Sequence, residues 1–190
     1  MIDNVLTILK NKLNDPVHGL KDGNQSGEIA VVENIVKSEA DDTSAVANKV
    51  VITLLNVEEE STLKNRSWYT RTVRTETPLQ YDMEKQNPPA YLNLYVMIAA
   101  NRDAYEKSLS DISKVIEIFQ TNSVLEYNGF KFRIELHSIP FEQLSYVWGL
   151  LGGKVMPSAF YKISVVEIAA TAKEDINLID EVAIESFKVD

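Results

Sequence analysis

The stretch that decides the fold is Glu142–Glu167, EQLSYVWGLLGGKVMPSAFYKISVVE. Its first part places aromatic and aliphatic residues at helical spacing, which predicts a short helix over about residues 141–151. The glycines Gly152-Gly153 then suit the positive φ angles at the end of a helix. The second part is rich in β-branched and aromatic residues and predicts a long strand over Ser158–Ala170. The stretch therefore predicts a helix, a glycine turn and a strand in that order.

Before this stretch lies a hairpin, the clearest local signal in the chain. Two runs of alternating apolar residues flank Asn128-Gly129, within residues 124–136. Asn-Gly favours a two-residue type I′ turn. Such a turn pairs Tyr127 with Phe130 and Leu125 with Phe132 on one face. The charged residues of the second strand are then expected on the opposite face.

The middle of the chain predicts a strand followed by a helix. Alternation over Ala90–Ala100 predicts a strand with two different faces. One face holds Leu92, Leu94, Val96 and Ile98, and the other holds Tyr91, Asn93, Tyr95 and Met97. We expect Asn101 to cap a helix over 102–120. Its apolar stripe is expected to contain Tyr105, Leu109, Ile112, Ile116 and Phe119.

The remaining elements complete an α+β pattern. Residues 2–14 have the spacing of an amphipathic helix, and 29–36 favour a strand. The β-rich run over 49–57 favours a strand buried on both faces. Residues 58–89 predict a long loop or an extended strand pair. No linker divides the chain, so we expect a single domain over 1–190, with an antiparallel or mixed β-sheet and helices packed on it.

Composition narrows the classes of function. The 190 residues carry a formal net charge of −9, which disfavours a general nucleic-acid binder. The absence of cysteine excludes disulfides and cysteine metal sites. No apolar run reaches the length of a membrane span, and the N-terminus is unlike a signal peptide. We therefore expect neither nucleic acid nor membrane as a partner, and a cytosolic origin fits.

Residues that could carry catalysis or bind metal do not form a known motif. His137 lies beside Ser138, but neighbours on a strand point apart, whereas a catalytic triad must meet in space. The acidic run Glu58–Glu60 lacks the alternating ligands of a calcium loop. The glycines before Lys154 lack the Ser or Thr of a phosphate loop. We expect no catalytic residues, no cofactor and no metal, and hence no enzyme.

One cluster of basic and aromatic residues is unusual in an acidic protein. It contains Arg66, Trp68, Tyr69, Arg71 and Arg74. Arginine, tryptophan and tyrosine dominate binding hot spots, so the cluster suits a protein interface. Packing of its aromatic rings on the sheet explains the same composition equally well, and stacking on single-stranded nucleic acid is a third reading. For the helix over 141–151, core packing is expected for Tyr146 and Trp148, with an interface role second.

A resemblance to a known family adds a function. The run Leu144–Gly152, followed by Pro157-Ser158 and Tyr161, resembles a signature of cap (tail-terminator) proteins of phage-like contractile injection systems, including the antifeeding-prophage type. The order of elements resembles that family over most of the chain. The chain is expected to correspond to the conserved terminator domain, without the C-terminal extension that some relatives carry.

The resemblance implies a structural role without catalysis. Such proteins form a ring, usually sixfold, at the distal end of tube and sheath, where they end polymerisation and hold the last sheath ring. The implied partners are further copies of the chain, the sheath protein and the inner tube protein. The implied location is assembly in the cytoplasm and then a phage tail-like particle.

Two interface segments are expected, and two other functions stay open. The first segment is the Arg66–Arg74 cluster, and the second is a last strand over Glu181–Val189 that pairs with a sheath arm. The apolar residues of that strand are Val182, Ile184 and Phe187. The alternatives are a monomeric adaptor that binds peptides at a sheet edge, and a small hydrolase that uses His137 or acidic residues.

Overall fold

The computed structural model describes residues 1–20, 27–38, 45–63, 69–73, 81–127, 130–168 and 173–176. The chain divides into two compact units, and each is described by itself. The first unit comprises residues 1–60 and 92–166, and the second comprises 61–91 and 167–190. The single domain expected over 1–190 remains a prediction.

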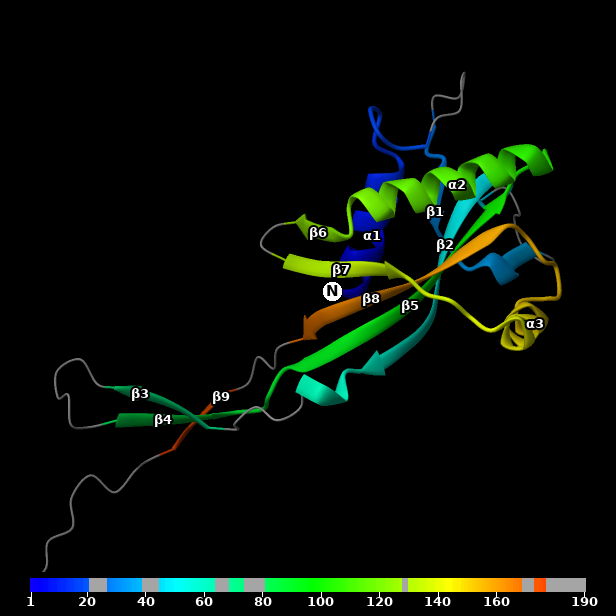
Figure 1. Ribbon diagram of the computed structural model, residues 1–190. Helices are drawn as coiled ribbons and strands as arrows, with labels where there is room; N and C mark the ends of the chain where they lie inside the picture. The colour runs from blue at the N-terminus through cyan, green and yellow to red at the C-terminus, as the bar shows by residue number, and fades with distance from the viewer. Residues whose placement is uncertain are drawn as a thin grey trace, which may run out of the picture. The chain divides into compact units, whose positions relative to one another are not determined.

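The first unit holds a six-stranded sheet with three α-helices (Figure 1). Its elements, in chain order, are α1 (Ile2–Leu13), β1 (Ala30–Val32), the 3-10 helix η1 (Ile35–Ser38), β2 (Lys49–Glu59), β5 (Ala90–Asn101), α2 (Tyr105–Thr121), β6 (Val124–Tyr127), β7 (Phe130–Leu136), α3 (Phe141–Leu150) and β8 (Ser158–Ile168). The strand order is β1-β2-β5-β8-β7-β6. Because β1 runs parallel to β2 while β2 and β5 are antiparallel, the sheet is mixed. The expected α+β class with a mixed sheet is confirmed.

Both faces of this sheet are covered, so the unit has three layers. On one face α1 and α2 bury their apolar sides against strand residues such as Ile52, Ile98 and Ile163. On the other face Trp148 of α3 and Ile35 of η1 pack against a second, smaller cluster that includes Met97. The alternation predicted for β5 is confirmed, because its even-numbered residues join the first cluster and Met97 joins the second.

The strand register of the hairpin is as predicted. Tyr127 pairs with Phe130 and Leu125 with Phe132. Phe132 and Ile134 are buried, whereas the charged residues that alternate with them, Lys131, Arg133 and Glu135, are exposed, as alternation requires. The turn residues Asn128 and Gly129 lie outside the described residues.

The start of α2 differs from the prediction. Asn101 is not a helix cap: it is the last residue of β5, and its side-chain amide donates to the carbonyl of Val46 at 3.0 Å. The N-cap position belongs to Ala104. The predicted stripe is also partly wrong, because Tyr105 and Leu109 are exposed.

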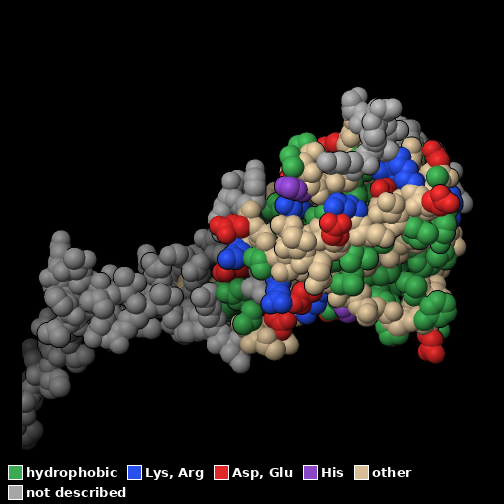
Figure 2. All heavy atoms as spheres, turned by 45° about the horizontal axis from the view of Figure 1, so that its top comes forward, with side chains coloured by type: hydrophobic (Ala, Val, Ile, Leu, Met, Phe, Trp, Pro, Cys, Tyr) green, Lys and Arg blue, Asp and Glu red, His purple; other side chains and the backbone are tan. Residues whose placement is uncertain are grey.

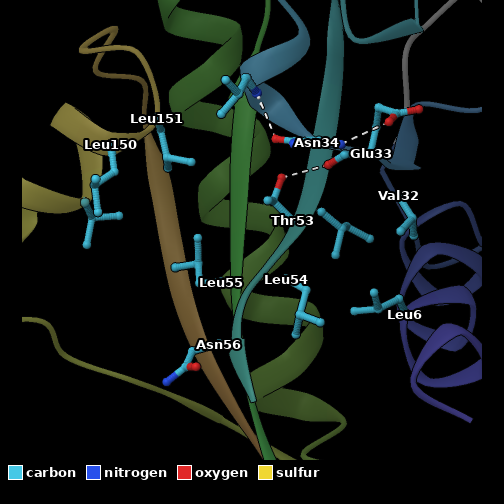
Figure 3. A pocket seen from close by; sticks show the side chains of 13 residues that line it. Leu6, Val32, Glu33, Asn34, Thr53, Leu54, Leu55, Asn56, Leu150 and Leu151 are labelled. Atoms are coloured by element: carbon cyan, nitrogen blue, oxygen red, sulfur yellow. Dashed lines mark hydrogen bonds between the residues drawn. The ribbon is translucent and has the colours of Figure 1, made fainter.

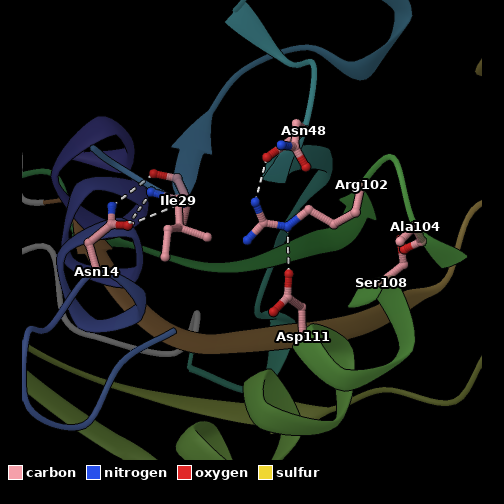
Figure 4. Close-up of polar contacts among 8 residues, drawn as sticks. Asn14, Ile29, Asn48, Arg102, Ala104, Ser108 and Asp111 are labelled. Carbon is pink, nitrogen blue, oxygen red and sulfur yellow. Dashed lines mark hydrogen bonds and ion pairs between the residues drawn. The ribbon is translucent and has the colours of Figure 1, made fainter. Parts of the chain in front are cut away.

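A polar pair accounts for this difference. The buried face of α2 instead includes Asp111, whose carboxylate accepts from the guanidinium Nε of Arg102 at 2.6 Å (Figure 4). Arg102 also donates to the backbone carbonyl of Asn48. The helix is thereby rotated so that an ion pair, rather than Tyr105 and Leu109, faces the sheet. The pattern of apolar residues in the sequence does not reveal such a buried ion pair.

Three strand predictions need correction. The strand expected over 29–36 is shorter, because β1 ends at Val32 and η1 begins at Ile35. In β2 only the first half is buried, and the residues from Asn56 to Glu59 are exposed. Strand alternation by itself predicts that only one of the neighbours Phe160 and Tyr161 faces a core, but both are buried because the sheet has a core on each face.

The second unit contains a three-stranded antiparallel sheet. Its strands are β3 (Tyr69–Val73), β4 (Tyr81–Gln86) and β9 (Lys173–Ile176), in the order β3-β4-β9. A short 3-10 helix, η3 (Ser61–Leu63), precedes them. Of the two structures expected for residues 58–89, the strand pair is the one that forms, as β3 and β4.

Candidate functional site

The most exposed apolar surface among the described residues lies on α3 and just after it. The exposed fractions are 86% for Phe141, 74% for Tyr146, 85% for Leu150 and 71% for Val155. We call these four residues the α3 patch. Figure 2 shows one face of the molecule, on which hydrophobic side chains gather in the right-hand part. Within the patch, Tyr146 and Leu150 are neighbours on one face of α3 at i, i+4. Large exposed apolar side chains that lie together mark an interaction site in a folded protein.

Local chemistry sets the two ends of α3. The amides of Gln143 and Leu144 donate to the carbonyl of Pro140, so the helix begins directly after proline. At the other end the amide of Gly153 donates to the carbonyl of Trp148 at 2.7 Å. Gly152 and Gly153 have φ angles of 90° and 73°, which confirms the predicted glycine turn. Trp148 is buried as expected, whereas Tyr146 is exposed and so is not a core residue.

A groove follows the edge of β2, next to the α3 patch. Its volume is about 770 Å³, and its lining is mostly apolar. Figure 3 shows Leu54 and Leu55 of β2 between Leu6 of α1 on one side and, on the other, Leu150 of α3 and Leu151 directly after it. Its upper end is formed by β1 and the turn after it, where the hydroxyl of Thr53 donates to the carbonyl of Glu33 at 2.8 Å. We call this feature the β2 groove.

The edge of β1, unlike that of β2, is occupied by a side chain. The amide oxygen of Asn14 accepts from the backbone amides of Ile29 and Ala30, both at 2.9 Å. The amide nitrogen of Asn14 donates to the carbonyl of Ala30 at 2.8 Å (Figure 4). Asn14 thus occupies the backbone groups at the start of β1, which hinders pairing of another chain at that point.

A smaller pocket of about 220 Å³ lies beside His137. The imidazole packs edge-on against the ring of Tyr95, with ring centres 5.2 Å apart. Burial, and then a hydrogen bond to Glu58, raise the pKa of Tyr95. Neither serine nor threonine is among the described residues that line this pocket, so the hydrolase alternative has no hydroxyl nucleophile of that kind beside His137.

The described part of the chain also offers no metal centre. No group of three or more His, Asp or Glu side chains in it is placed to hold a metal ion. Within the same residues, no helix has both the length and the apolar character needed to cross a membrane.

The structure places only part of the predicted interface segments. Tyr69 and Arg71 lie on β3, the outer strand of the three-stranded sheet. Arg66, Trp68 and Arg74 lie outside the described residues, as do Val182, Ile184 and Phe187. Sequence reasoning missed the α3 patch and the β2 groove. The signal for the patch was present, since 141–151 is apolar around most of the helix circumference.

These features define a class of protein: an α+β unit without a recognisable catalytic centre among its described residues, but with an exposed apolar helix and a grooved sheet edge. A family model described as the Pvc16 N-terminal domain matches residues 4–180. The chain therefore belongs to the Pvc16 N-terminal domain family, and the resemblance carried by Leu144–Tyr161 is confirmed. No curated protein matches the sequence.

Two solved structures have a similar fold. One is the sheath/tube terminator of an extracellular contractile injection system, PVC, in its extended state: the TM-score is 0.60 at 14% identity, over 100% of this chain and 65% of that one. The other is the tube-terminating cap of the anti-feeding prophage: the TM-score is 0.57 at 11% identity, over 97% of this chain and 60% of that one. The chain thus spans less than two thirds of the length of either protein. Both are described as terminators or caps and neither as an enzyme, in agreement with the expectation for this chain.

Proposed function

We propose that this protein is a structural cap of a contractile injection system. It forms a sixfold ring at the distal end of tube and sheath, ends their polymerisation and anchors the last sheath ring. It assembles in the cytoplasm and then stays in the particle. Membership of the Pvc16 N-terminal domain family is the observation that carries this proposal.

The surface of the first unit supports a role in assembly. The α3 patch exposes four large apolar side chains beside the mostly apolar β2 groove. A monomeric protein gains nothing from keeping such a patch in water, whereas a subunit that is covered on two sides uses it for binding. The predicted contacts at Arg66–Arg74, with Trp68 and Arg71 at its centre, and at Glu181–Val189 belong to the same proposal.

The test is particle assembly with and without this protein. Tube and sheath proteins are co-expressed with it, the particles are sedimented, and their ends and lengths are measured by negative-stain microscopy. We expect density at one end and a uniform length with the protein, and neither without it. Normal lengths in its absence, together with no co-sedimentation, would remove the proposal and favour the monomeric adaptor.

A pair of variants links the result to the surface. Leu150→Lys places a charge in the α3 patch, whereas Val17→Lys places the same charge on an exposed apolar residue in the turn after α1. Both side chains are exposed, so both variants should fold. We expect capping to be lost in Leu150→Lys and kept in Val17→Lys, because a buried unpaired charge opposes binding. Equal capping by both variants would exclude the α3 patch from the interface.

A further inference from the structure

We propose that β3 of one subunit adds as an extra strand to the open edge of β2 of the next subunit, inside the β2 groove. The inference rests on the ring proposed above and names the contact that closes it. It is a β-augmentation, in which backbone hydrogen bonds give affinity and side-chain pockets give specificity.

The edge of β2 is open over more than half of its length. β1 pairs only with Val50–Ile52. After β1, the amide of Glu33 donates to the carbonyl of Ile52 at 3.2 Å, and the hydroxyl of Thr53 donates to the carbonyl of Glu33 at 2.8 Å. β2 continues to Glu59, bonded to β5 on its other side, with a bulge between Leu54 and Asn56.

The backbone amide of Val50 and the backbone carbonyl of Ile52 point toward β1. Alternation therefore points the backbone amide and carbonyl of Leu54 toward the same edge of β2, which β1 no longer covers. No described strand pairs with β2 there.

The walls of the groove fit a strand and not a helix. An added strand lying beside β2 would point its side chains alternately toward the two faces of the sheet. On one face it would meet Leu6 and Leu54, and on the other Leu55, Leu150 and Leu151 (Figure 3). Both walls are apolar, so a strand that fits places an apolar or methyl-bearing side chain against each wall.

The charge of the groove selects a basic strand. Glu33 is the only charged residue among those that line it, and β2 runs on into the exposed Glu58 and Glu59. The segment 66–74 contains three arginines and no acidic residue, in a chain with a net charge of −9. Alternation along β3 puts Tyr69, Arg71 and Val73 on one face and Thr70 and Thr72 on the other, so β3 offers one wall apolar and basic residues and the other wall threonine methyl groups. Complementary charge favours this pairing over an acidic strand.

The lengths and the free edges also match. β3 has five residues, and it is an outer strand of its own sheet, so that one of its edges lacks a partner strand among the described residues. The stretch of β2 beyond β1 is Thr53–Glu59. Asn14 occupies the backbone groups of Ile29 and Ala30 at the start of β1. On the open stretch of β2, where Thr53 bonds to the carbonyl of Glu33, no side chain of the described residues is bonded in this way to Leu54 or Leu55.

The symmetry of the contact between two copies determines whether they form a closed dimer or a ring. If β2 paired with β2 of a second copy, the contact would be isologous and would close a dimer. Pairing of β3 with β2 joins two different surfaces. Such a heterologous contact repeats from copy to copy and closes a ring when the rotation allows it.

The absence of native cysteine allows a clean cross-linking test. Asn56→Cys puts a thiol on the open part of β2, and Thr72→Cys puts one on β3. The two single variants are mixed with tube and sheath proteins, and a short bis-maleimide is added. Glu126→Cys, on the exposed face of β6 at the opposite edge of the same sheet, replaces Asn56→Cys as the control.

We expect cross-linked dimers from Asn56→Cys with Thr72→Cys, and at least about tenfold fewer with Glu126→Cys, since only the first pair is brought together by the contact. A chain with both Asn56→Cys and Thr72→Cys should give a ladder of multimers that ends at the ring. Caps at particle ends without these dimers would overturn the β3–β2 contact and leave the proposed function standing. A cross-link within a single chain would also overturn it. Absence of caps would refute both.

A charge exchange tests the register of the contact. Glu33→Arg or Arg71→Glu alone is expected to reduce the yield of cross-linked dimers roughly two- to fivefold, the range for a solvent-accessible ion pair. Combined as a mixture of Glu33→Arg subunits and Arg71→Glu subunits, the yield should recover. A yield that falls further in the mixture would show that Arg71 does not lie near Glu33.

Discussion

Replacing Asp111 by alanine is expected to lower the free energy of unfolding by about 3–5 kcal/mol, the cost of removing one partner of a buried ion pair. The side chains of Arg102 and Asp111 are 0% and 9% exposed, and their closest atoms, Nε and Oδ2, are 2.6 Å apart. The same guanidinium donates to the carbonyl of Asn48, a residue with a φ angle of 55°. Asp111→Ala would therefore leave a buried cation and loosen the turn before β2.

The measurement is urea and thermal unfolding of the intact chain. For a protein of this size about 1 kcal/mol corresponds to about 2–4 °C, so the melting temperature should fall by about 6–20 °C. The matched control is Glu117→Ala on the same helix. Glu117 pairs with Lys114 at 2.9 Å, but the two side chains are 65% and 41% exposed. Removal of a surface pair of this kind should cost less than about 1 kcal/mol.

A double variant separates the loss of the pair from the cost of the charge that remains. Arg102→Met with Asp111→Leu removes both charges and keeps the space filled, which should restore stability to within about 1–2 kcal/mol of the original. The reasoning would be refuted if Asp111→Ala cost no more than Glu117→Ala. It would also be refuted if the double variant were as unstable as the single one, because burial of an unpaired charge would then not be the cause.

Three further predictions concern the core and the C-terminal segment. Trp148→Ala should cost about 3–5 kcal/mol in urea unfolding, whereas Tyr146→Ala should change stability by less than about 0.5 kcal/mol, and equal costs would contradict the burial of Trp148 alone. Burial raises the pKa of Tyr161, whose hydroxyl has no hydrogen-bond partner among the described residues, so Tyr161→Phe should leave stability unchanged or raise it by about 1 kcal/mol. Since the raised pKa favours the neutral phenol in the folded state, the free energy of unfolding should fall as the pH rises above about 10. The fall should be smaller in Tyr161→Phe. An equal fall in both proteins would show that ionisation of Tyr161 is not the cause. Deleting residues 178–190 should abolish co-sedimentation with sheath while circular dichroism stays the same, and binding by the shortened chain would count against a role for Val182, Ile184 and Phe187.

Much of the fold is predictable where local chemistry and periodicity agree. The register of the β6–β7 hairpin follows from Asn128-Gly129 and the alternation on both sides of it. The two faces of β5 follow from strict alternation, and the end of α3 follows from its glycines. In each case the controlling interactions are between residues close in sequence, which is why the sequence alone suffices.

The predictions from sequence fail where contacts between residues far apart in the chain determine the structure. Asn101 is drawn to the carbonyl of Val46, fifty-five residues away, rather than to the start of α2. The rotation of α2 depends on Asp111 meeting Arg102, and the burial of Phe160 depends on α3 and η1 covering the second face of the sheet. Periodicity reports how apolar a side of an element is, but not which partner or charge covers it.

The candidate site was harder to predict than the fold because its most specific residues serve the core. Trp148 and Tyr161, which carry the family resemblance, are both buried, on opposite faces of the sheet. Trp148 holds α3 on its face of the sheet, and Tyr161 packs against Phe119 of α2 on the other face. The apolar residues on the outer side of α3, such as Tyr146 and Leu150, remain exposed. A helix that is apolar around most of its circumference is stable only when both sides are covered. The sheet covers one side of α3, and in the proposed cap the second side is covered by the assembly.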